Sequence, residues 1–97
     1  MRFRVSLTRS AEADLNVFRA FEQRLIVGAI KAHLTTDAGA ETRRRKRLNT
    51  NPLAPWELRV GDHRVFYSIE GADTVKIIAV GVKIHNDLFI RGRKVDL

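Results

Sequence analysis

The 97-residue sequence has no cysteine, two prolines, and one residue each of tryptophan and tyrosine. Without cysteine the chain can form no disulfide, no thiolate metal site and no cysteine nucleophile. No stretch approaches the roughly 18 consecutive apolar residues of a membrane-spanning helix, and the N-terminus lacks the apolar segment of a secretory signal. We therefore expect a protein of the reducing cytoplasm that makes no use of a membrane.

Negative charge is also scarce, because 11 Asp and Glu face 18 Lys and Arg, which gives a formal net charge of +7. The length predicts a single domain over residues 1–97, and the 44% hydrophobic content is typical of a globular chain with a modest core. We find no internal repeat. The positive charge favours a polyanionic partner, either a nucleic acid or an acidic protein.

In the N-terminal half, residues 2–7 alternate between apolar and polar side chains, which predicts a strand. Thr8 or Ser10 can cap a first helix. After a break near residues 20–21, apolar residues that recur every four positions predict a second helix ending near Leu34.

The C-terminal half follows a basic connector over residues 41–51 and is predicted to consist of strands. Gly61–Asp62 forms a two-residue turn between two of them, and one strand is apolar on both faces, as a central strand is. The strands are expected at residues 56–60, 63–69 and 74–82, with a short hairpin at 88–90 and 94–97. This order predicts an α+β fold, a twisted and mainly antiparallel sheet packed on one face against an N-terminal helical hairpin. The other face is expected to stay open for a partner or ligand.

The two-residue turn places Arg59 opposite Arg64 on the open face, together with Glu57 and Phe66. Two like charges directly opposite each other destabilise a sheet by up to about 1 kcal/mol. An anion held between the two guanidinium groups would offset this repulsion, because arginine binds phosphate bidentately. In the alternative interpretation, Glu57 lies diagonal to Arg64 and neutralises the pair. Both interpretations stay open at this point.

Lys83 and His85 follow the central strand and share a face if the strand continues that far. Lys83 adds positive charge, and His85 is the group best suited to exchange protons near neutral pH, although an exposed loop histidine is the simpler interpretation. His63 is expected on the core side, and His33 has no acidic or histidine partner four residues on. The three histidines therefore predict no metal site.

The connector contains five consecutive cations, Arg43, Arg44, Arg45, Lys46 and Arg47. Such a run is a solvated loop, a nuclear-localisation signal, or a contact with the phosphate backbone of RNA, and the net charge of +7 favours the last. Phe66, expected on the same face as the arginine pair, is able to stack on a base. The paired aromatics and GxxG clamp of common RNA-binding domains are absent.

Residues 56–67 read WELRVGDHRVFY and residues 77–83 read IIAVGVK. These segments resemble the RelE/ParE family of bacterial type II toxins, whose pattern is a hairpin with L-R/K-V-G-x-x-R followed by an apolar strand that ends in V-G-x-K/R. The resemblance covers the whole chain in element order. It implies a sheet with a concave face, backed by a helical hairpin.

For RelE-like members the resemblance implies a ribosome-dependent mRNA endonuclease that inhibits translation without metal or cofactor. The 2′-OH attacks the adjacent phosphate, and cationic side chains offset the charge of the transition state. Carried over by position, Arg59, Arg64 and Lys83 would supply that charge, and His85 would exchange protons.

The sequence departs from the RelE-like pattern at two positions. Glu57 stands where lysine is frequent, and Phe89 stands where a catalytic tyrosine is expected. Phe89 has no hydroxyl, so it can stack on an RNA base but cannot transfer a proton. Two alternatives therefore remain: a ParE-like toxin that inhibits DNA gyrase without nuclease activity, or an RNA- or ribosome-binding relative with weakened catalysis.

The resemblance also implies a partner besides the ribosome and mRNA. Toxins of this family are normally neutralised by a cognate antitoxin encoded alongside. The net charge of +7 predicts that this antitoxin is acidic.

Overall fold

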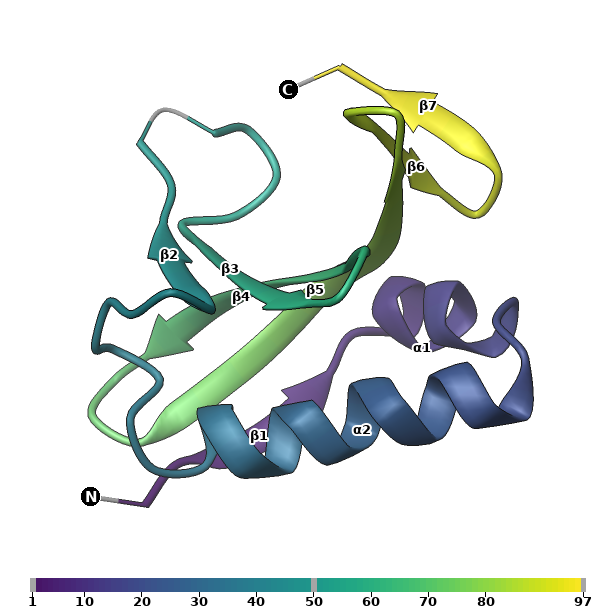
Figure 1. Ribbon diagram of the computed structural model, residues 1–97. Coiled ribbons are helices and arrows are strands. Elements are labelled where there is room, and N and C mark those ends of the chain that lie inside the picture. The colour runs from purple at the N-terminus through teal and green to yellow at the C-terminus, as the bar shows by residue number, and fades with distance from the viewer. Residues whose placement is uncertain (1, 50, 97) are drawn as a thin grey trace.

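The computed structural model describes residues 2–49 and 51–96, which form a seven-stranded sheet with two helices on one face (Figure 1). Along the chain the elements are β1 (Arg4–Leu7), α1 (Arg9–Asn16), α2 (Ala20–Leu34), β2 (Arg45–Arg47), β3 (Trp56–Val60), β4 (His63–Glu70), β5 (Thr74–Ile84), β6 (Asp87–Ile90) and β7 (Arg93–Val95). Strands β2 to β7 are antiparallel neighbours in chain order, and β1 pairs parallel to β5. The predicted α+β fold with a helical hairpin is confirmed.

Most predicted elements are present with small shifts of their boundaries. The Thr8 hydroxyl accepts a hydrogen bond from the backbone N–H of Ala11 at 3.0 Å and so caps α1, while the break between the helices falls at residues 17–19. The sequence did not indicate β2, because its three residues are all cations and show no apolar alternation. Leu97, expected in the last strand, lies outside the described residues. No helix in the described chain is long and apolar enough to cross a membrane.

The main core lies between the helices and the sheet. From α2, Ile26, Ile30 and Leu34 are buried against it. Trp56 and Tyr67 stack with ring centroids 5.9 Å apart, and the Tyr67 hydroxyl donates a hydrogen bond to the Ala38 carbonyl at 2.8 Å. The remaining buried members are Ala11, Ala38, Leu58, Val65, Val75, Ile77 and Val80.

A second apolar cluster covers the centre of the other sheet face, which we call the concave face. Here Phe66, Ala79 and Leu88 pack with Ala54 and with partly buried residues that include Leu48 and Leu53. Figure 1 shows the loop after β2 and the β6–β7 hairpin rising on the same side of the curved sheet. The expectation of an open face is therefore wrong at its centre. The connector carries apolar residues beside its charges, and these fold back over the sheet.

One edge of β5 is shared by two short strands. β1 pairs with it as far as the Leu7–Ile77 pair, and β6 pairs from Val82–Phe89 onward. In the interval between them, the Thr8 hydroxyl donates a hydrogen bond to the Ile78 carbonyl at 3.2 Å. Polar side chains at the start of α1 thus replace a missing strand neighbour.

Asp14 of α1 is the buried centre of this junction. Its Oδ2 accepts a hydrogen bond from the backbone N–H of Val80 at 3.0 Å, and its Oδ1 lies 2.8 Å from Nε of Arg91 in the β6–β7 turn. Its side chain is fully buried, so the carboxylate is shielded from water and joined to a cation. Helix α1, strand β5 and the C-terminal hairpin therefore meet at one carboxylate.

Replacing Asp14 with Ala should lower the free energy of unfolding by about 1–3 kcal/mol, because it leaves the buried Val80 N–H without an acceptor, while the half-exposed Arg91 can turn to solvent. Asp14→Asn should cost less, since the amide oxygen can still accept from Val80. Urea denaturation measures both. Asp73→Asn is the control, because its pair with Arg4 at 3.6 Å is exposed and should contribute less than about 1 kcal/mol. Equal losses in all three variants would contradict the assignment.

Gly81 and Gly28 offer a matched pair of glycine substitutions. A Cβ at Gly81 would lie 2.7 Å from the backbone oxygen of Phe89, whereas a Cβ at Gly28 would meet no heavy atom within 4 Å. Gly81→Ala should therefore destabilise by about 1–3 kcal/mol, because β6 must move away. Gly28→Ala should stabilise α2 by about 0.5–1 kcal/mol. Thermal or urea unfolding tests both, and a neutral Gly81→Ala would show that β6 shifts freely.

Candidate functional site

The β3–β4 hairpin has the predicted register. Gly61 adopts a φ of 59° in the turn, a value that favours glycine, and Arg59 pairs with Arg64 across the two strands. The pairs Leu58–Val65 and Trp56–Tyr67 face the helices, so the arginines face the concave side.

Glu57 lies between the two arginines. Its Oε2 is 3.4 Å from Nε of Arg59, and its Oε1 is 3.5 Å from Nε of Arg64. The Glu57 side chain is only 7% exposed, so solvent screens its charge only weakly. The sequence left open whether the arginine pair holds an anion or is neutralised by Glu57. The structure has the ion pairs that the second interpretation requires.

The Arg64 side chain folds back onto its own turn and is 13% exposed. Its Nη1 donates to the carbonyl oxygens of Gly61 at 2.7 Å and His63 at 2.8 Å. Arg59, by contrast, is 42% exposed. The Nε of Arg64 lies 3.5 Å from Glu57 but is buried without a hydrogen-bond partner. The two guanidinium groups therefore do not form a free bidentate clamp, and Arg59 is the more accessible of the two to an incoming anion.

Two lysines share the concave face with the arginine pair. Lys46 of β2 is paired with Glu57 and therefore lies on the concave face. Gly81 of β5 is paired with Arg64, so Lys83, two residues further along β5, points to the same side. Lys83 lines a hollow of about 290 Å³ with Asn86 of the β5–β6 turn and with residues of the β6–β7 hairpin, among them Lys94. The accessible cations of this face thus include Lys46, Arg59 and Lys83.

His85 lies beyond the end of β5, and Phe89 points away from this face. β5 ends at Ile84, and His85 sits in the following turn with a φ of 51°, exposed to solvent. Strand alternation therefore does not carry His85 to the side of Lys83. Phe89 pairs with Val82 and so points to the opposite face from Lys83. If the turn between β5 and β6 had been predicted, counting residues across it would have shown that Phe89 pairs with Val82.

Phe66 is fully buried in the second apolar cluster. The hypothesis that it stacks on an RNA base is therefore wrong. Alternation correctly assigned its face, but sequence pattern alone did not show that Leu48, Leu53 and Ala54 cover it.

The run of five cations is divided by the alternation of β2. Arg45 faces the helices and is buried; its Nε donates to the carbonyl of Ala40 at 2.8 Å and its Nη1 to that of His33 at 2.9 Å. Its predicted contact with RNA is therefore wrong, because the guanidinium joins the connector to the end of α2. The guanidinium carbon of Arg47 lies 5.6 Å from the ring centroid of Trp56. Arg43, Arg44, Lys46 and Arg47 are exposed.

Glu22, His33 and Tyr67 have pKa values shifted by their surroundings. His63 lies 2.9 Å from Glu22, and this hydrogen bond lowers the pKa of Glu22. Burial raises the pKa of the Tyr67 hydroxyl and lowers the pKa of His33, the latter aided by nearby arginines. His63 is structural, as expected. Over residues 2–49 and 51–96, no three His, Asp or Glu side chains gather as a metal site requires.

A curved antiparallel sheet backed by a helical hairpin is also the fold of a chain in the crystal structure of the toxin–antitoxin complex RelBE2 from Mycobacterium tuberculosis. The TM-score is 0.73 at 23% identity, and the match covers 86% of this chain and 100% of that one. At this identity the likeness shows the fold alone. No curated protein matches the sequence.

Residues 5–83 match the family described as the ParE toxin of the type II toxin–antitoxin system parDE. The chain therefore belongs to the ParE toxin family, within the RelE/ParE toxins of type II toxin–antitoxin systems. This confirms the family resemblance seen in the hairpin and central strand.

Replacing Glu57 with Gln should lower the free energy of unfolding by about 1–3 kcal/mol, because two directly opposed guanidinium groups lose the carboxylate between them. Glu70→Gln is the matched control: Glu70 is 54% exposed and pairs with Lys76 at 3.4 Å, so its loss should change stability by less than about 1 kcal/mol. Urea denaturation compares the two. Equal stability of Glu57→Gln and the unmodified chain would mean that the arginines do not depend on Glu57.

Proposed function

We propose that this toxin acts by binding its target protein in the cytoplasm and does not cleave RNA. The target is DNA gyrase, as the resemblance to gyrase-inhibiting ParE toxins implies. The observation that carries the proposal is the buried Glu57 carboxylate, which forms ion pairs with both Arg59 and Arg64 where a ribonuclease needs unpaired cations.

The chemistry of RNA cleavage sets requirements that this concave face meets poorly. A metal-free attack by the 2′-OH needs a group to take its proton, a group to protonate the leaving oxygen, and donors aimed at the phosphate oxygens. The guanidinium of Arg64 is occupied by two carbonyls and Glu57. Tyr67, the chain's one tyrosine, is buried on the helix side. His85, the group predicted to exchange protons, lies in an exposed turn beyond the end of β5.

A second candidate is the metal-free, ribosome-dependent mRNA endonuclease. It is favoured by the exposed Arg59 and by Lys46 and Lys83 on the same face, which together form a cationic surface suited to a phosphodiester. In that case Arg59 and Lys83 would contact phosphate oxygens, His85 would exchange protons, and Glu57 would have to move away from the arginines on the ribosome.

The proposed partner that neutralises the toxin is an acidic cognate antitoxin. The fold match to a chain of a toxin–antitoxin complex supports such a partner, and so does the net charge of +7. The product of the adjacent open reading frame is the protein to test.

Two assays on the purified chain separate these functions. We expect inhibition of gyrase supercoiling and no new mRNA ends by primer extension in a translating extract. His85→Ala should inhibit gyrase within about twofold of the unmodified chain, because a binding toxin needs no proton transfer there. Glu70→Gln, a change at an exposed ion pair, controls for loss of activity during purification.

Discrete mRNA fragments that require ribosomes and fall about 10²-fold or more in His85→Ala would overturn the proposal in favour of the endonuclease. Inhibition of translation with neither fragments nor gyrase inhibition would contradict both, and would indicate a toxin that only binds RNA or the ribosome.

A further inference from the structure

Helix α2 is apolar on two opposite sides. Its inner side buries Ile26, Ile30 and Leu34 against the sheet. On its outer side, the side chains of Phe21 and Leu25 are left 52% and 58% exposed. Exposed apolar side chains that line one side of a helix mark an interaction surface. The outer side of α2 therefore has the composition of an interface.

The outer apolar residues follow a particular spacing. Phe21, Leu25, Gly28 and Ala32, which we call the α2 seam, are all exposed and are separated by four, three and four residues. Steps of three and four alternate in the seam of a coiled coil, because they keep one stripe of a helix facing its neighbour. Gly28 has open space beyond its Cα, so a second helix can approach the backbone closely there. The spacing selects a helix as the occupant.

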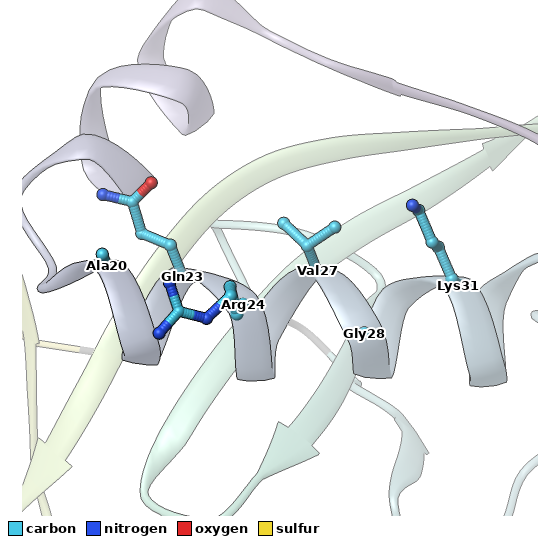
Figure 2. Close-up of a pocket in the computed structure, with 6 residues that line it drawn as sticks. All are labelled: Ala20, Gln23, Arg24, Val27, Gly28 and Lys31. Carbon is cyan, nitrogen blue, oxygen red and sulfur yellow. The ribbon is translucent and has the colours of Figure 1, made fainter.

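The charges beside the seam select the chemistry of that helix. Arg24 and Lys31, each one residue before a seam residue, are both exposed. They border a hollow of about 510 Å³ along α2, in which Val27 and Lys31 project from the same side of the helix (Figure 2). Within the described chain neither cation forms an ion pair. Charges at these flanking positions determine which partner a coiled-coil helix accepts.

We propose that the α2 seam binds an amphipathic helix of the antitoxin, with acidic side chains flanking its apolar stripe. This inference rests on the proposed function in that the antitoxin is the partner. A second copy of the chain does not fit, because an antiparallel pair of α2 helices would set Arg24 and Lys31 against the same cations.

Leu25 and Val17 make a matched pair of variants. Both are 58% exposed, but Val17 caps the end of α1 and lies outside the seam. Titration calorimetry with the adjacent reading-frame product should show that Leu25→Gln weakens binding at least about tenfold, as a central apolar contact does. Val17→Gln should stay within about twofold of the unmodified chain. Urea denaturation of both variants checks that the fold is unchanged.

The flanking charges are tested by reversing them. Arg24→Glu with Lys31→Glu should weaken binding about tenfold or more, and should remove most of its decrease with added salt. Arg2→Glu with Arg9→Glu changes the net charge equally at exposed positions outside α2, and should leave binding within about threefold.

The outcomes separate the two levels of the proposal. If the reading-frame product does not bind the unmodified chain, the antitoxin assignment fails and this inference fails with it. If it binds all variants equally, the toxin–antitoxin assignment stands and the α2 seam is overturned. A dimer of the chain alone in sedimentation equilibrium, lost in Leu25→Gln, would overturn it in favour of a second copy.

Discussion

The buried carboxylate of Asp14 is the interaction on which the shape of the molecule depends. β1 and β6 share one edge of β5, and on that edge residues 78–81 have no strand neighbour, whereas β4 pairs with β5 along the other edge. Asp14 supplies the acceptor that the Val80 N–H needs in this gap. The same carboxylate holds Arg91 in the turn of the C-terminal hairpin. The curvature of the concave face is thus anchored by a residue on the helix side of the sheet.

The positive charge that the concave face offers to a ligand depends on which arginines already bind groups inside the protein. A net charge of +7 describes the whole chain, but Arg45 is bound by two carbonyls beneath the connector, and Arg64 by two carbonyls and Glu57. A guanidinium whose donors are occupied inside the protein has few left for a ligand. The chain is therefore less suited to phosphate chemistry than its composition indicates, while Arg24 and Lys31 beside the α2 seam form no ion pair among the described residues.

The hairpin and the helices could be predicted because their signals are local. The turn at Gly61–Asp62 determines the pairing of Arg59 with Arg64, and apolar spacing reveals the buried side of α2. The cover over Phe66 could not be predicted, because it depends on a connector without regular periodicity meeting a strand far along the chain. The gap in the ladder beside β5 likewise depends on where two distant strands stop.

The amino-acid sequence by itself determined the family, the α+β class, the hairpin register and the residues that share each sheet face, because side-chain alternation and turn chemistry act over a few residues. Only the tertiary structure decided which of those side chains remain available. Glu57 reaches both arginines, Phe66 is covered, and Phe89 points away from Lys83, because long-range packing and strand ends determine exposure and partners.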